Sequence, residues 1–196
     1  MRKINGIIQA GGRASRIGLN KAFLDVGGKR IIDRIIGELS SCVDKIVIVA
    51  NEPEEYRSLG FPVHPDVIPG VGSLGGIYSG LFHSDAEWNF IVACDMPFLS
   101  AELVRRLSDR AEGCDIVVER SNVGFEPLAA LYARSILPVL RTMIDGGDLA
   151  IHRLFGKVRT RVAELDPLFL QRHPHLFFNI NTREDWESAQ RMAKII

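Results

Sequence analysis

Short apolar runs alternate with amphipathic segments along the first part of the chain. Runs rich in Ile, Val and Ala, each a candidate strand, occupy residues 4–9, 45–50, 89–94 and 115–119. Between the first two runs, Ile31, Ile35 and Leu39 recur at helical spacing and predict an amphipathic helix. A second helix is expected after Ser100, a residue type that caps helix N-termini. Apolar strands alternating with helices favour a mostly parallel sheet covered on both faces.

The pattern is less regular after residue 119. It predicts strands at 128–133, 158–165 and 176–180 and a helix at 135–144. Near the C-terminus, Thr182 and Asp185 have capping-box spacing and precede Trp186 and Ala189 at helical spacing, which predicts a last helix. We therefore expect an α/β fold, a three-layer αβα sandwich around a doubly wound sheet, in a single domain over residues 1–196.

Composition and charge exclude several classes of function. The chain has 196 residues, 46% hydrophobic and 24% charged, which is typical of a soluble globular protein. Lys plus Arg equals Asp plus Glu at 24 each, so overall charge argues against nucleic-acid or membrane binding. Cys42, Cys94 and Cys114 show no C-x-x-C spacing, which indicates reduced thiols rather than disulfides or zinc. With no signal-peptide pattern or membrane-spanning run, we expect a cytoplasmic protein.

The first strand runs into a basic, glycine-rich loop. In chain order the residues are Gln9, Ala10, Gly11 and Gly12, followed by the cations Arg13, Arg16 and Lys21. Glycines let backbone amides approach an anion closely, and cations at the carboxyl end of a strand sit where open α/β sheets bind ligands. The pattern matches neither G-x-G-x-x-G nor the Walker loop. A turn with a solvated basic edge is the alternative, but the clustered cations favour a bound triphosphate.

Asp95 follows the apolar strand at 89–94 and should project from the same sheet edge. Mg²⁺ commonly takes one or two protein carboxylates together with phosphate oxygens and water, so this aspartate is a candidate metal ligand. A helix-capping role is the alternative, although Ser100 already has the pattern of the cap. No nucleophile motif is present, which fits phosphoryl chemistry driven by positioning and charge neutralisation through Lys21 and Mg²⁺.

The glycine loop resembles the A-G-G-x-S-x-R-M-G-x-x-K loop of the molybdenum cofactor nucleotidyltransferases, with Ile17 in place of Met. Further segments are similar in the same order along nearly the whole chain. They are Asn51 after the second strand, Asp66 in His-Pro-Asp, the Gly-Ser-Leu-Gly-Gly of residues 72–76, Asp95, and the Asn-Ile-Asn-Thr of residues 179–182. The resemblance implies the Rossmann-like fold of the nucleotide-diphospho-sugar transferases.

The resemblance also implies an activity: transfer of GMP from GTP to molybdopterin, with release of pyrophosphate and Mg²⁺ as the cofactor. It implies these roles: catalysis by Lys21, Arg16 and Asp95; nucleotide binding by Gln9, Ala10, Gly11, Gly12, Lys21, Asn51, Asp66 and Asp95; acceptor binding by Asn179 and Asn181; and metal binding by Asp95. Molybdoenzymes or other cofactor-biosynthesis proteins would be its protein partners. Asp66 would contact either guanine or ribose, and residues 70–76 would form a flexible lid leading into a helix.

Two departures from the family leave alternatives open. Ser73 stands where relatives often carry proline and is similar to the cytidylyl branch. Leu149 and Ala150 follow Gly-Asp where many relatives have arginine, which leaves recognition of the acceptor phosphate open, and Arg153 is the candidate replacement for that arginine. The alternative activities are CTP-dependent transfer to molybdopterin and transfer to a sugar or polyol phosphate. A non-catalytic nucleotide-binding regulator is a further alternative, disfavoured because Lys21 and Asp95 are both retained.

Overall fold

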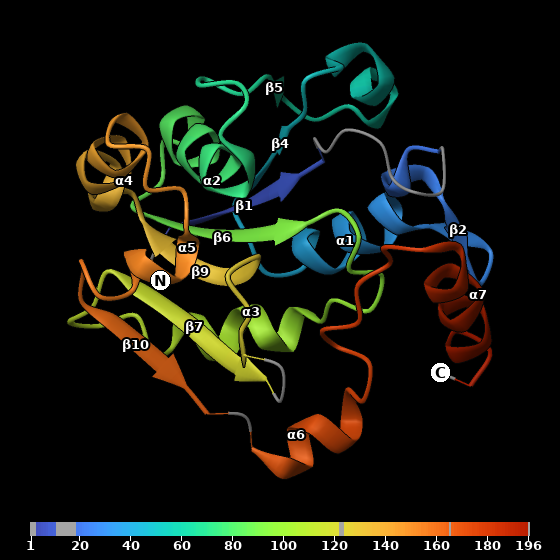
Figure 1. The fold of residues 1–196 in the computed structure, drawn as a ribbon. Helices are drawn as coiled ribbons and strands as arrows, with labels where there is room; N and C mark the ends of the chain where they lie inside the picture. Colours follow the sequence, from blue (N-terminus) through green and yellow to red (C-terminus); the bar gives the residue numbers. More distant parts are fainter. Residues whose placement is uncertain (1–2, 11–18, 122–123, 165, 196) are drawn as a thin grey trace.

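The protein is built around one large twisted sheet. The computed structural model describes residues 3–10, 19–121, 124–164 and 166–195 (Figure 1). The sheet contains β1 (Ile4–Gln9), β4 (Lys45–Val49), β5 (Val63–His64), β6 (Trp88–Ala93), β7 (Ile116–Ser121), β8 (Gly124–Phe125), β9 (Ala129–Ala133) and β10 (Thr160–Ala163). Its strand order is β10-β7-β9-β6-β1-β4-β5, with β8 paired to β7.

Strand direction decides which residues reach the same edge of the sheet. β1 is parallel to β4 and β6, β4 is parallel to β5, and β10 is parallel to β7. β9 is antiparallel to both of its neighbours, β6 and β7. The carboxyl ends of β1, β4, β5, β6 and β7 therefore share one edge, and β9 begins there instead of ending there.

Helices cover both faces of the sheet and divide the core into two clusters. One cluster packs α1 (Ile31–Ser40), α3 (Ala101–Ser108), α6 (Pro167–Arg172) and α7 (Arg183–Met192) against the sheet. The other packs α2 (Gly72–His83), α4 (Leu137–Asp145) and α5 (Ile151–Leu154) on the opposite face (Figure 1). The predicted three-layer, mostly parallel α/β fold is confirmed. None of the described helices is both long and apolar enough to cross a membrane.

Short elements complete the described chain. The 3₁₀ turns span Lys21–Phe23, Pro53–Leu59 and Arg134–Ile136, and β2 (Asp25–Val26) forms a small antiparallel hairpin with β3 (Lys29–Arg30). This hairpin lies against α7, because the Trp186 indole N–H donates to the Asp25 carbonyl at 2.6 Å. The C-terminal helix is thus attached to the β2–β3 hairpin, and the Gln190 amide also donates to the Asp25 carbonyl at 2.9 Å.

Two predicted helix starts are confirmed by their caps. The Ser100 hydroxyl accepts a hydrogen bond from the Glu102 N–H at 3.2 Å at the start of α3. At α7, the Thr182 hydroxyl accepts from the Asp185 N–H at 3.1 Å, and the Asp185 carboxylate accepts from the Thr182 N–H at 2.8 Å. Each side chain satisfies a backbone donor that the first helical turn leaves without a partner.

The predicted strand at 176–180 is wrong. This segment turns instead: the Phe178 N–H bonds to the His175 carbonyl at 2.9 Å, and the Ile180 N–H bonds to the Asp95 carbonyl at 2.9 Å. Leu176 and Ile180 are buried against the core, so their apolar character reflects packing of an irregular segment and not a strand. Short apolar runs do not separate these two cases.

The predicted flexible lid at 70–76 is also wrong over most of its length, because α2 already begins at Gly72. A Cβ atom on Gly76 would lie 2.7 Å from the Gln9 side chain, and one on Gly80 would lie 2.5 Å from Ile7 Cγ2. These glycines therefore allow α2 to pack directly on β1. Residues 72–76 form the first turns of a packed helix.

Candidate active site

Three side chains from distant parts of the sequence converge at the carboxyl edge of the sheet. The Lys21 ammonium donates to Asn181 Oδ1 at 2.8 Å and lies 3.3 Å from Asp95 Oδ2. The side chains of Lys21 and Asp95 are only 20% and 21% exposed, so the ion pair is partly shielded from solvent. The structure thus brings together a predicted phosphate ligand, a predicted metal ligand and a predicted acceptor ligand.

Asp95 is held by its backbone on both sides. The preceding N–H, of Cys94, donates to the Gln9 carbonyl at 2.9 Å, and the Asp95 carbonyl accepts from the Ile180 N–H. Within the described residues, the buried Asp95 Oδ1 atom has no hydrogen-bond partner. A buried carboxylate oxygen without a donor is costly, and coordination of a cation relieves that cost. Ser100, not Asp95, provides the cap of α3.

The donor set fits a small divalent cation that also binds phosphate. Asp95 supplies the orphaned carboxylate oxygen and Asn181 supplies a neighbouring amide oxygen. No cluster of three or more His, Cys, Asp or Glu residues suited to a metal occurs in the part of the chain that the structure describes. Mg²⁺ does not require such a cage, since it usually takes one or two carboxylates plus phosphate oxygens and water.

The neighbouring thiol offers no nucleophile. Burial, together with the adjacent Asp95 carboxylate, raises the pKa of Cys94 to about 12. Because the thiolate is the reactive form of cysteine, this thiol is inert at neutral pH. The groups available for chemistry at this edge are therefore the Lys21 ammonium and the side-chain oxygens of Asp95 and Asn181.

Asn51 and Asp66 form a second cluster at the ends of β4 and β5. The Asn51 amide donates to Asp66 Oδ2 at 2.9 Å and its Oδ1 accepts from the Asp66 N–H at 3.0 Å. The Ser79 hydroxyl, on α2, lies 3.4 Å from Asp66 Oδ1 and 2.7 Å from the Gly75 carbonyl. The Asp66 carboxylate is thereby fixed at the sheet edge, with capacity to accept further hydrogen bonds.

The end of β1 is tied to its neighbours. The Gln9 amide donates to the Ser73 carbonyl at 3.4 Å, and the Ala10 N–H donates to the Val49 carbonyl at 2.9 Å. The Ala10 carbonyl accepts from the buried Tyr56 hydroxyl at 2.8 Å. The predicted ligands Gly11, Gly12 and Arg16 lie outside the described residues.

Asn179 does not join either cluster. Its amide donates to the carbonyl of Phe177 at 3.0 Å, within its own turn. Asn181, two residues later, reaches Lys21 while its backbone N–H donates to the Asp185 carboxylate at 2.9 Å. The two predicted acceptor ligands therefore occupy different surroundings.

Sequence reasoning missed the residues that position Lys21. Asn20 Oδ1 accepts from the Ala22 N–H at 3.1 Å, and the Asn20 amide donates to the Tyr56 hydroxyl at 2.8 Å. Burial raises the pKa of Tyr56, so its hydroxyl stays protonated. Tyr56 belongs to no recognisable sequence pattern. Asn20 could have been recognised, because asparagine immediately before a helical turn is a capping signal.

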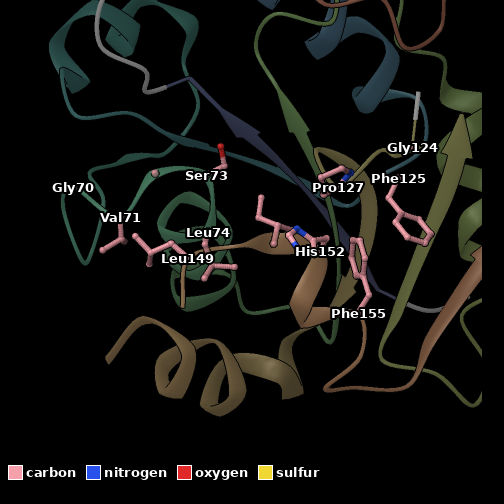
Figure 2. Close-up of a pocket in the computed structure, with 12 residues that line it drawn as sticks. Gly70, Val71, Ser73, Leu74, Gly124, Phe125, Pro127, Leu149, His152 and Phe155 are labelled. Atoms are coloured by element: carbon pink, nitrogen blue, oxygen red, sulfur yellow. The ribbon is translucent and has the colours of Figure 1, made fainter. Parts of the chain in front are cut away.

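Sequence reasoning also missed a pocket at this edge, shown in Figure 2, with a volume of about 620 Å³. Its lining comes from the start of α2, from the β8 and β9 region, and from the α5 region. The residues are Gly70, Val71, Gly72, Ser73, Leu74, Gly124, Phe125, Pro127, Leu149, Ile151, His152 and Phe155. Most of these side chains are apolar, in contrast to the charged Lys21 and Asp95 pair.

The fold and the converging side chains define a class. An open α/β sheet with a lysine ammonium and a buried carboxylate oxygen close together at its carboxyl edge is suited to binding a metal-bound nucleotide. The MobA-like NTP transferase domain family matches residues 6–162. The chain belongs to this family and is therefore a nucleotidyltransferase, which confirms the family expected from the glycine loop and Asp95.

Individual relatives span the whole chain. It is 36% identical to the molybdenum cofactor guanylyltransferase of Desulfosudis oleivorans, covering 99% of this chain and 98% of the relative. The molybdenum cofactor guanylyltransferase of Syntrophotalea carbinolica is 31% identical over 96% of this chain and 91% of its own length. The crystal structure of molybdopterin-guanine dinucleotide biosynthesis protein A from Archaeoglobus fulgidus has a TM-score of 0.83 at 26% identity, covering 98% of this chain and 100% of that chain.

Proposed function

We propose that this protein transfers GMP from GTP to the phosphate of molybdopterin and releases pyrophosphate. The observation that supports this most directly is the contact of Lys21 with both Asp95 and Asn181 at the carboxyl edge of the sheet. Relatives at 36% and 31% identity over almost the full chain are molybdenum cofactor guanylyltransferases. Their guanylyl activity favours GTP over the CTP-dependent alternative and molybdopterin over a sugar or polyol phosphate.

The reaction needs no strong base, because the attacking acceptor phosphate is already an anion. An acceptor phosphate oxygen forms a bond to the α-phosphorus of GTP, and the bond from that phosphorus to the pyrophosphate oxygen breaks. Lys21 places a positive charge where negative charge grows on the leaving group. Asp95 and Asn181 would hold Mg²⁺, which when bound neutralises charge on the phosphate oxygens. Arg16 would add a further cation.

The base would be recognised at Asp66. The carboxylate held by Asn51 can accept two hydrogen bonds from the N1–H and the exocyclic amine of guanine, a donor pair that cytosine lacks. Gln9 and Ala10, together with Gly11 and Gly12, would place backbone groups along the nucleotide. Asn179 would contact the acceptor.

We further propose where the enzyme acts and with which partners. It acts in the cytoplasm as a single domain over residues 1–196, with Mg²⁺ as its metal, and its product passes to molybdoenzymes or to other cofactor-biosynthesis proteins. The molybdenum cofactor guanylyltransferases among its relatives support this setting.

The test is pyrophosphate release from each of GTP, CTP, ATP and UTP, with and without molybdopterin and Mg²⁺. We expect release only when GTP, molybdopterin and Mg²⁺ are present together. Preference for CTP would overturn the guanylyl assignment, and turnover with a sugar phosphate in place of molybdopterin would overturn the acceptor. Tight GTP binding with no turnover on any acceptor would indicate a regulator.

A further inference from the structure

The second half of α2 lies against the segment that carries Asp66 (Figure 1). This segment starts in β5, the last strand in the sheet order, and continues beyond the strand from His64 to Val67. Past His64 the chain has left the hydrogen-bonded ladder of β4 and β5. The position of the Asp66 carboxylate therefore depends on contacts outside the sheet.

Ser79 holds the backbone immediately after Asp66. The residue has no exposed surface, and its hydroxyl oxygen accepts a hydrogen bond from the Val67 N–H at 2.9 Å. The hydroxyl proton has two acceptors nearby, the Gly75 carbonyl at 2.7 Å and Asp66 Oδ1 at 3.4 Å. The shorter distance favours the Gly75 carbonyl, so the serine joins α2 to the chain beside Asp66.

His83 contacts the chain immediately before Asp66. Its ring stacks on the ring of His64, with centroids 4.1 Å apart and planes inclined by 8°. Burial, followed by the nearby His64, lowers the pKa of His83, although an interaction with the backbone of Pro65 opposes this shift. The His83 ring is therefore uncharged at neutral pH and adds no charge repulsion to the stack.

These contacts come from one face of α2. Ser79 and His83 are four residues apart and so lie one turn above the other. Ser79 contacts the residue that follows Asp66, and His83 contacts the two residues that precede it. Asn51 holds the N–H and the carboxylate of Asp66 itself. The helix thus fixes the chain on both sides of a carboxylate whose own hydrogen bonds come from β4.

We infer that Ser79 and His83 are positioning residues for base recognition: they hold the chain on both sides of Asp66 and thereby set the preference of the protein for guanine. The inference rests on the proposed function for the role of Asp66. A carboxylate that accepts two hydrogen bonds from a base must be placed to within about 0.5 Å. A shift of residues 64–67 would weaken both bonds without removing the carboxylate. The sequence resemblance gave neither Ser79 nor His83 a role.

The test compares Ser79→Ala with the matched control Ser100→Ala. Both serines are buried, at 0% and 8% exposure, and each hydroxyl accepts a hydrogen bond from a backbone N–H, that of Val67 or that of Glu102. Ser100 lies at the start of α3, on the other face of the sheet from α2. The two variants therefore lose the same kind of hydrogen bond, but only Ser79→Ala loses one beside Asp66.

Two histidine variants test the other contact. His83→Ala removes the ring stack, whereas His83→Phe retains a flat ring against His64. The dissociation constants for GTP and for ITP are measured by titration calorimetry with Mg²⁺ and without acceptor. Their ratio reports the contact to the exocyclic amine, which ITP lacks. Each alanine variant is also made together with Asp66→Asn, and thermal unfolding checks that every variant is folded.

We expect Ser79→Ala and His83→Ala each to lower the preference for GTP over ITP by about fivefold, because a displaced carboxylate loses part of a charge-assisted hydrogen bond. His83→Phe should retain most of the preference. Ser100→Ala should retain all of it while losing as much thermal stability as Ser79→Ala. In the Asp66→Asn protein, neither alanine substitution should lower the preference further, since both act through that carboxylate.

Three results would overturn the inference: an unchanged preference in the folded alanine variants, an equal loss in Ser100→Ala, or a further loss in the Asp66→Asn protein. Equal affinity of the unmodified protein for GTP and ITP would overturn it as well. If Ser79→Ala does not fold, the two histidine variants decide.

The two proposals can fail separately. If the unmodified protein transfers GMP to molybdopterin and the folded variants keep its preference for GTP over ITP, the proposed function stands and the positioning role falls. If the unmodified protein transfers no GMP but prefers GTP over ITP in a way that depends on Ser79 and His83, the positioning role stands and the proposed reaction falls.

Discussion

Glu119 makes the folding stability of this protein dependent on pH in an unusual direction. The residue lies in β7 with no exposed surface, and neither carboxylate oxygen has a hydrogen-bond partner among the described residues. Burial raises the pKa of Glu119 to about 7, partly opposed by the positive charges of Arg106 and Arg110. Because a buried carboxylate without donors is disfavoured, the folded state retains the proton to a higher pH than the unfolded chain.

The direction and the size of this pH dependence follow from the difference between the pKa of Glu119 in the unfolded and folded states. In the unfolded chain the group ionises near its ordinary value of 4.5, and in the folded state near 7. Below pH 4.5 both states are protonated and the full stability is present. Between these values only the unfolded state loses its proton, so the free energy of unfolding falls as pH rises. The total loss is about 3 kcal/mol once pH exceeds 7, at about 1.4 kcal/mol for each pH unit.

The measurement is denaturant unfolding of the unmodified protein and of Glu119→Gln from pH 4.5 to pH 8.5. Glutamine keeps the shape but cannot ionise, so the difference between the two proteins isolates this group from all others that titrate. We expect the variant to gain about 3 kcal/mol relative to the unmodified protein between the two ends of the range. If the two stability curves run parallel across this range, Glu119 does not carry a raised pKa and the reasoning is refuted.

Three further predictions concern the active site. Asp95→Asn should lower turnover on the order of a hundredfold or more while shifting the thermal midpoint by less than about 4 °C, because the lost ion pair is partly exposed; near-normal turnover at low Mg²⁺ would show that Asp95 does not hold the metal. Lys21→Ala should weaken GTP binding by about tenfold or more in a folded protein, measured by titration calorimetry, and unchanged binding and kinetics would exclude its phosphate role. Asp66→Asn should cost more with GTP than with ITP, which lacks the exocyclic amine, and equal losses in kcat/KM would move Asp66 to ribose or to a structural role.

Much of the fold could be predicted because the pattern is local and periodic. The run at residues 4–9 coincides with β1, and the helix expected around Ile31, Ile35 and Leu39 is α1. Caps at Ser100 and Thr182 are also local signals, since donor and acceptor lie within a few residues. The position of Asp95 at this edge follows from the end of β6, whereas Lys21 begins the 3₁₀ turn Lys21–Phe23 well beyond the end of β1, and only the folded chain brings it to Asp95.

The rest depends on contacts between distant residues. The antiparallel direction of β9 has no sequence signature, because its apolar residues would suit a parallel strand equally well. The hydrogen bond from Tyr56 to Ala10 and the reciprocal pair of Asn51 and Asp66 appear only when the chain is folded. The pocket at Phe125 and Phe155 joins segments that no single periodicity links.

The reversed direction of β9 has a consequence for how the pocket of such an enzyme can be altered. A parallel strand would reach the catalytic edge only at its end and would then need a crossover helix, whereas β9 starts there after the short connection from β7. Residues 124–128 are thus a segment that could be exchanged as a unit, joined to β6 by the hydrogen bond from the Ala93 N–H to the Leu128 carbonyl. Exchanging this segment between homologues should change one wall of the pocket while leaving the strands that carry Gln9 and Asp95 in place.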